Sequence, residues 1–264
     1  MKINLDGKIA LVSGSTAGIG LAIAQGLAEA GAQIIVNGRT DKRIESAIHE
    51  IIKKSPQARV VGIAADMSTA EGTAKTIQKF PQVDILVNNM GIFEPKPFFE
   101  IPDSDWLRFF EANVLSGIRL ARHYTPLMVK KGWGRVIFIS SESAVQIPAE
   151  MVHYGMTKTA QLAVARGLAE TVANTGVTVN SVLPGPTRSE GVGTFVADMA
   201  KQAHKTEADV EKDFFKTIRP SSLIQRFATT EEVANMVVYV ASEQASATTG
   251  AALRVDGGVV RAIV

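Results

Sequence analysis

Short apolar runs alternate with longer segments of helical periodicity along the whole chain. The runs, rich in Val and Ile, are residues 8–12, 33–36, 59–64, 83–87, 135–140, 177–182 and 252–255. Between them, apolar residues recur with a helical period in residues 19–30, 43–53, 105–131, 152–173 and 231–241. Alternating strands and helices predict an α/β fold, with a doubly wound parallel sheet of about seven strands and helices on both faces.

One stretch, residues 186–222, interrupts this alternation. It contains no candidate strand, and it becomes strongly charged between residues 201 and 216. Because it follows an expected strand, it lies beyond the carboxyl end of the sheet, where folds of this kind bind ligands. Connections this long are commonly functional or disordered, and we favour a substrate lid over a surface insertion. No Pro/Gly/Ser-rich linker or internal repeat divides the chain, so we expect residues 1–264 to form a single domain.

Composition and charge narrow the class of protein. Hydrophobic residues make up 46% and charged residues 20% of the 264 positions, as in ordinary globular proteins. A net charge of +2 is too small an excess of positive charge to indicate binding to nucleic acid or to an anionic membrane surface. The absence of cysteine excludes disulfides and thiolate metal sites, and the four scattered histidines show no ligand motif, so we expect no metal. No apolar run approaches a membrane span, and the run at residues 8–12 is too short for a signal peptide, so we expect a cytoplasmic protein.

A glycine-rich loop, residues 14–20, follows the first expected strand and opens the first expected helix. Glycines permit a close backbone approach to a pyrophosphate, and the amides at a helix start hold the anion. The spacing is G-x-x-x-G-x-G, and no lysine follows the last glycine, which argues against hydrolysis of ATP or GTP. The pattern predicts a Rossmann-like dinucleotide site with contacts from Gly14, Ser15, Thr16, Gly18, Ile19 and Gly20.

The end of the second expected strand bears on the choice of cofactor. An acidic residue at this place would bind the adenosine ribose and repel a 2′-phosphate, but no carboxylate occurs before Asp41. The planar guanidinium group of Arg39 can donate two hydrogen bonds to a phosphate, which favours NADP(H). The alternative is a solvated Arg39 and NAD(H) as cofactor. Asp66, which closes the third strand, can accept from the adenine amino group or cap residues 68–73.

With these features the chain resembles the short-chain dehydrogenase/reductase family, in its compact single-domain branch, over nearly its whole length. Within that branch it looks closest to the 3-oxoacyl-thioester reductases. The resemblance rests on motifs in one order: the glycine loop, Asn88-Asn89-Met90-Gly91, Asn113, Ser141, Tyr154-Gly155-Met156-Thr157-Lys158, Pro184-Gly185 and Val255-Asp256-Gly257-Gly258. Met90 departs from the usual small alanine, and Ser13 from the usual threonine before the loop.

The resemblance implies roles for individual residues. It makes Ser141, Tyr154, Lys158 and Asn113 catalytic, with Lys158 also on the nicotinamide ribose and Asn113 supporting a water relay to that lysine. It further implies that the cofactor is contacted by Met67, Asn89, Gly91, Pro184, Gly185 and Thr187. It also implies a homo-oligomer, a tetramer or a dimer.

Tyr154 and Lys158 stand four residues apart on an expected helix and therefore share a face. Free tyrosine titrates near 10, and a nearby cation lowers the pKa of an acid, so we expect Lys158 to lower that of Tyr154. Tyr154 would then act as general acid in reduction and as base in oxidation. Ser141 would hold the substrate oxygen, while Glu142, Gln146, Met151 and His153 are further pocket candidates or simply structural.

The sequence thus predicts an oxidoreductase that interconverts a carbonyl and a secondary alcohol by hydride transfer, acting on a small-molecule substrate. One alternative is a regulator that binds NADP(H) without turnover, but an intact Ser141, Tyr154 and Lys158 set counts against it. A nucleotide-sugar epimerase or dehydratase is a second alternative, and the chain fits it poorly because those relatives have a shorter glycine spacing and a longer substrate domain.

Overall fold

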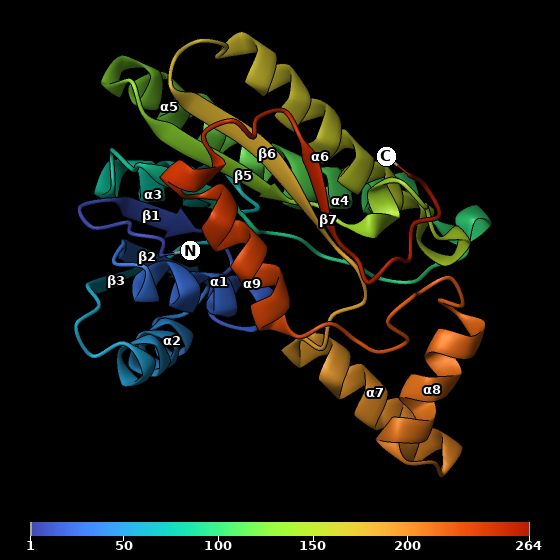
Figure 1. The fold of residues 1–264 in the computed structure, drawn as a ribbon. Helices are drawn as coiled ribbons and strands as arrows, with labels where there is room; N and C mark the ends of the chain where they lie inside the picture. Colours follow the sequence, from blue (N-terminus) through green and yellow to red (C-terminus); the bar gives the residue numbers. More distant parts are fainter. Residues whose placement is uncertain (1, 264) are drawn as a thin grey trace.

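Seven parallel strands form one sheet in the computed structural model, which describes residues 2–263 apart from the side chain of Phe195. The strands are β1 (Ile9–Val12), β2 (Gln33–Gly38), β3 (Val60–Ala64), β4 (Ile85–Asn88), β5 (Gly134–Ile139), β6 (Val177–Pro184) and β7 (Ala252–Val255). Their order is β3-β2-β1-β4-β5-β6-β7 (Figure 1). The order reverses between β1 and β4, so the crevice beyond the carboxyl ends of these strands is the expected ligand site. The predicted doubly wound sheet is confirmed.

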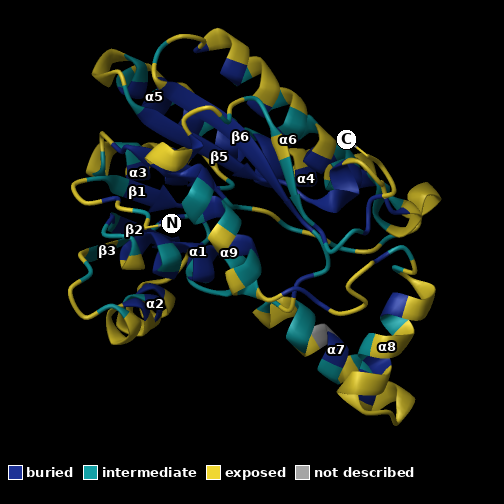
Figure 2. Ribbon diagram, viewed as in Figure 1, coloured by how far each residue is buried: buried dark blue, intermediate teal, exposed yellow. Residues whose placement is uncertain are grey.

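Helices cover both faces of the sheet. One face packs against α1 (Gly18–Glu29), α2 (Asp41–Lys54) and α9 (Thr230–Val240), and the other against α3 (Ala70–Lys79), α5 (Ser116–Lys131) and α6 (Val152–Thr171). Successive strand residues point to opposite faces, so Val12 and Val36 enter the first core while Leu11 and Ile35 enter the second. The central strands are therefore buried on both sides (Figure 2), which is why they are continuous apolar runs.

The expected helix over residues 105–131 contains a change of helical type. It begins as α4 (Asp103–Phe110), widens into a π-helical turn (Glu111–Leu115) and continues as α5. Such turns insert one extra residue and commonly occur at functional sites. Here the turn carries Asn113, and the side-chain bonds described below hold Asn113 in this position.

Residues 186–222 contain two helices that the apolar pattern did not predict, α7 (Glu190–Ala203) and α8 (Glu207–Thr217). They project from the body of the molecule beyond the sheet (Figure 1). A small core of their own joins them, made of Val196, Ala200, Val210, Phe215 and Phe227. Short 3₁₀ turns occur at Phe98–Glu100, Glu142–Ala144, Ala149–Met151 and Glu243–Ala245.

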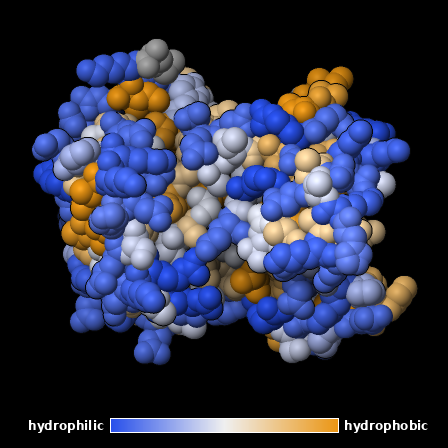
Figure 3. All heavy atoms as spheres, turned by 90° about the horizontal axis from the view of Figure 1, so that it is seen from below, coloured by the Kyte–Doolittle hydropathy of each residue, from blue (hydrophilic) through white to orange (hydrophobic). Residues whose placement is uncertain are grey.

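The face that carries these helices is mostly hydrophilic, with apolar residues exposed on it in separate groups (Figure 3). Across residues 2–263, every helix is too short or too polar to cross a lipid bilayer. The same residues contain no group of three or more His, Cys, Asp or Glu side chains arranged to hold a metal ion.

Candidate active site

The glycine loop connects β1 to α1 at the point where the strand order reverses. Gly14 and Gly18 have φ angles of +61° and +55°, which side chains rarely adopt. A Cβ on Gly20 would lie 2.4 Å from the carbonyl oxygen of Gly14, so a larger residue there would displace the loop. The loop therefore forms a close-fitting cradle at the amino end of α1, as a pyrophosphate requires.

Asn37, at the end of β2, holds this loop in place. Its Oδ1 accepts from the Gly14 amide (3.0 Å), and its Nδ2 donates to the Ala65 carbonyl (2.9 Å). Its own amide donates to Ser15 Oγ (2.9 Å), and that hydroxyl donates to the Val12 carbonyl (2.7 Å). Sequence analysis missed this role. The only signal in the sequence was a polar residue near the end of an otherwise apolar strand.

Asn89 also supports the loop. Its Nδ2 donates to the carbonyls of Ser13 (3.0 Å) and Gly14 (3.1 Å). The Ser13 hydroxyl in turn accepts from the amides of Asn89 (2.9 Å) and Met90 (3.0 Å). The Asn89 side chain, expected to contact the cofactor, is thus engaged in shaping the cradle.

The residues expected near the adenosine lie at the carboxyl ends of β2 and β3. Arg39 is exposed directly after β2, as a 2′-phosphate contact requires. Asp66 Oδ1 accepts from the amide (3.0 Å) and hydroxyl (2.6 Å) of Ser68, while Thr69 caps α3. The Met67 side chain is buried in the core, so only its main chain can reach a cofactor.

The segment after β6 is fixed by the terminal motif. A Cβ on Gly185 would lie 2.6 Å from the main-chain oxygen of Asp256, so the two segments touch. Thr187 is buried, and its hydroxyl donates to the Gly185 carbonyl (2.9 Å). Pro184 closes β6, which brings these residues to the same edge of the sheet as the glycine loop.

Ser141, Tyr154 and Lys158 come together beside this edge. Ser141 follows β5, and Tyr154 and Lys158 lie in the first two turns of α6. The Lys158 Nζ lies 5.7 Å from the centroid of the Tyr154 ring, and Phe93 packs edge-on against that ring at 6.4 Å between centroids. The arrangement places a hydroxyl, a phenol and an amine in one small polar site.

The electrostatics of this site differ from expectation. Burial raises the pKa of Tyr154, and the Glu142 carboxylate adds to that effect, while a hydrogen bond with Ser141 and the charge of Arg219 oppose it. Burial also lowers the pKa of Lys158 to about 8. Among residues 2–263, its Nζ donates to the neutral oxygens of Ile139 and Gln161 and to no carboxylate. The predicted lowering of the Tyr154 pKa is therefore wrong for the protein alone, since desolvation by burial dominates the shift.

Gln161 connects the lysine to Asn113. Lys158 Nζ donates to Gln161 Oε1 (3.2 Å), and Gln161 Nε2 donates to the Asn113 carbonyl (2.6 Å). The Asn113 side chain instead bonds the main chain of Ile92 and the Thr157 hydroxyl (2.9 Å). An amide side chain thus bridges Lys158 and the main-chain carbonyl of Asn113. Sequence analysis missed Gln161, although it lies three residues after Lys158 on the same helix face.

Glu142 lies directly against Ser141. It is buried, and its Oε2 accepts from the Ser141 hydroxyl (2.5 Å) and from the Ser143 amide (2.9 Å). Its Oε1 accepts from Nε of Arg219 (3.4 Å), which follows α8. Among the other pocket candidates, Gln146 is exposed, and His153 is fully buried against Phe109, 4.0 Å between ring centroids, so His153 does not line an open pocket.

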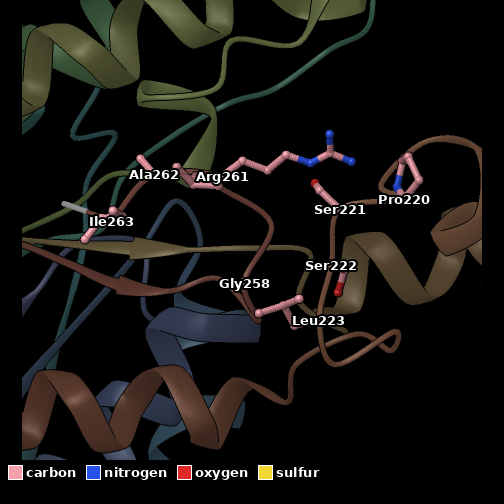
Figure 4. Close-up of a pocket in the computed structure, with 9 residues that line it drawn as sticks. Pro220, Ser221, Ser222, Leu223, Gly258, Arg261, Ala262 and Ile263 are labelled. Atoms are coloured by element: carbon pink, nitrogen blue, oxygen red, sulfur yellow. The ribbon is translucent and has the colours of Figure 1, made fainter.

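A separate hollow of about 500 Å³ lies between residues 220–223, which follow α8, and residues 258–263, which follow β7. Figure 4 shows Arg261 reaching across it toward Ser221 and Pro220. None of the residues expected to act in catalysis lines this hollow.

Comparison with known proteins identifies the family. A family model described as enoyl-(acyl carrier protein) reductase matches residues 14–260. The chain is 49% identical over 263 residues to the uncharacterized oxidoreductase YvaG of Bacillus subtilis (strain 168), covering 100% of both chains. It is 32% identical over 263 residues to the 3-oxoacyl-(acyl-carrier-protein) reductase FabG of Aquifex aeolicus (strain VF5), covering 98% of this chain and 100% of that one.

A solved structure agrees with these matches. The L-sorbose reductase of Gluconobacter frateurii, complexed with NADPH and L-sorbose, superposes with a TM-score of 0.93 at 32% identity, over 100% of both chains. The chain belongs to the short-chain dehydrogenase/reductase family. The comparisons support an oxidoreductase with a nicotinamide cofactor.

Proposed function

We propose that the protein is an NADP(H)-preferring oxidoreductase that interconverts a carbonyl and a secondary alcohol. One observation carries the proposal: Ser141, Tyr154 and Lys158 meet beside the glycine cradle, at the carboxyl edge of the sheet. A reacting group held at this edge lies next to a hydroxyl donor, a phenol and an amine, which are the groups that a carbonyl reduction uses.

The residues of this chain fit a dinucleotide. Gly14, Gly18 and Gly20 leave the backbone of the loop free to approach a pyrophosphate. A Cβ on Gly91 would lie 3.3 Å from Lys158 Nζ, so the glycine keeps that side of the lysine open for the nicotinamide ribose. Arg39 is exposed at the end of a strand without a carboxylate, which favours a phosphate on the adenosine ribose.

When bound, the nicotinamide supplies or accepts the hydride. Ser141 Oγ donates a hydrogen bond to the substrate oxygen and orients it. Tyr154 Oη delivers a proton to that oxygen in reduction, and it takes the proton back in oxidation. The raised pKa of Tyr154 keeps the phenol protonated before reduction. Lys158, as a cation, favours the phenolate that forms when this proton leaves.

Two properties of the whole protein belong to the same proposal. Residues 186–222, with α7 and α8, act as a substrate lid on a single catalytic domain, because their position beyond β6 borders the site. The protein assembles as a homo-oligomer, as the family resemblance implies. We also propose that it is cytoplasmic. Light scattering coupled to size-exclusion chromatography measures the assembly directly.

The proposal is tested by following NADPH oxidation with a panel of small carbonyl compounds. Wild type should reduce at least one of them, and Tyr154→Phe should lower kcat by roughly 10²- to 10⁴-fold, the usual contribution of a general acid. NADPH binding should be unchanged in this variant. Binding of NADPH without turnover of any carbonyl would instead favour the regulator, which the comparisons do not support.

A further inference from the structure

Glu142 is a buried carboxylate next to the residue proposed to hold the substrate oxygen. Only 7% of its side chain is exposed, and it accepts the one proton that the Ser141 hydroxyl can donate. Ser141 therefore cannot donate to Glu142 and to a substrate carbonyl at the same time.

Binding of a carbonyl compound consequently takes a donor away from Glu142. The Ser143 amide (2.9 Å) and hydroxyl (3.2 Å) still donate to its Oε2, but the bond from Ser141 is lost. A buried acceptor that loses a hydrogen bond without replacement costs free energy, and this loss counts against a substrate that offers no donor of its own.

A hydroxyl on the carbon next to the carbonyl replaces the lost donor. In an α-hydroxy ketone, the two oxygens sit on adjacent carbons, about one hydrogen-bond length apart. The two protein oxygens that would meet them, Ser141 Oγ and Glu142 Oε2, are themselves 2.5 Å apart. The carbonyl oxygen can accept from Ser141 while the neighbouring hydroxyl donates to Glu142.

The charges around Glu142 favour a neutral substrate. Arg219, only 12% exposed, lies between Glu142 and Glu150, with N···O distances of 3.4 and 3.3 Å. Two carboxylates thus flank its one positive charge, so this part of the site offers no excess positive charge to an anionic substrate.

We propose that Glu142 determines specificity, and that the substrate is a neutral α-hydroxy ketone, or the vicinal diol in the reverse direction. The proposal rests on the proposed function, because it assigns the substrate class of the same site. It concerns only the hydrogen bond that Glu142 accepts from the hydroxyl on the carbon next to the reacting one.

The test compares three ketones of similar size with NADPH: hydroxyacetone, fluoroacetone and butan-2-one. Fluorine is small and withdraws electrons from the carbonyl, but it cannot donate a hydrogen bond. Comparing hydroxyacetone with fluoroacetone therefore distinguishes the effect of hydrogen-bond donation from that of electronic activation of the carbonyl. Wild type should show a kcat/KM for hydroxyacetone about 10- to 150-fold above that for fluoroacetone, as expected for one hydrogen bond to a charged group.

Two variants assign the preference to a residue. Glu142→Gln should reduce the hydroxyacetone-to-fluoroacetone ratio at least several-fold, because a neutral amide is a weaker acceptor. Glu150→Gln is the matched control: it touches the same Arg219 but not Ser141, and it should leave the ratio unchanged. Thermal unfolding and NADPH titration verify that both variants are folded.

The outcomes separate this inference from the proposed function. Equal kcat/KM values for the three ketones in wild type would overturn the inference but would not contradict the proposed reductase function. The same holds for an unchanged ratio in Glu142→Gln, or for turnover of other carbonyls but of no α-hydroxy ketone. If NADPH does not bind at all, the proposed function itself fails.

Discussion

Lys158 combines a proposed catalytic role with an unfavourable buried charge, and the cost of that charge is measurable. Burial lowers its pKa from 10.5 to about 8. Each unit corresponds to about 1.4 kcal/mol, so the folded protein disfavours the charged lysine by about 3 kcal/mol relative to the unfolded chain. Replacing it with methionine removes this charge and keeps an unbranched apolar stem.

The sign of the pH dependence follows from the two pKa values. Below pH 8 both states bind the proton, and the full penalty applies to wild type. Between about pH 8 and 10.5 only the unfolded state binds it, so the stability of wild type rises with pH. The free energy of unfolding of wild type should therefore rise by about 3 kcal/mol relative to that of Lys158→Met across this pH range.

Urea unfolding followed by circular dichroism measures the difference at pH 7, 8, 9 and 10. The variant also loses the hydrogen bonds to Ile139 and Gln161, but this loss is the same at every pH and cancels in the comparison. Lys201→Met, at an exposed position, is the control and should show no such trend. A difference between wild type and Lys158→Met that stays constant from pH 7 to 10 would refute the reasoning.

Three further predictions concern the cofactor cradle. Arg39→Ala should weaken NADPH binding by about 10- to 150-fold and spare NADH in a nicotinamide-fluorescence titration; equal effects on both cofactors would exclude the 2′-phosphate contact. Asn37→Ala should lower the free energy of unfolding by about 1–3 kcal/mol and weaken the binding of both cofactors, because the Gly14 and Ala65 main chains lose their hydrogen-bond partners. Denaturant unfolding measures the change in stability, and an unchanged free energy of unfolding would contradict the prediction. Gly20→Ala should abolish binding of both cofactors, since its Cβ would meet the Gly14 carbonyl at 2.4 Å; unaltered affinity by calorimetry would show that the loop can shift.

The sheet could be predicted from the sequence because its central strands are buried on both faces and so are continuous apolar runs. The helices α7 and α8 could not, because their apolar residues face only a small local core and the segment is strongly charged between residues 201 and 216. The π-helical turn was also missed, since the inserted residue hardly changes the apolar period of a long helix.

The site was partly predictable for a different reason. Tyr154 and Lys158 are related by helical spacing, which a sequence displays directly. Asn37 and Gln161 act through bonds to main-chain atoms of other segments, and nothing in the sequence alone shows which segments those are. The pKa of Tyr154 was misjudged because its spacing from Lys158 indicates proximity to a charge but not the extent of desolvation.

The separate core of α7 and α8 has a consequence for how such a protein can diversify. The residues that anchor the cradle are tied into the sheet, so changing them disturbs the whole fold. Substitutions within α7 and α8 disturb mainly a cluster of five apolar side chains. A lineage can therefore vary the proposed substrate lid while the proposed catalytic site is left intact.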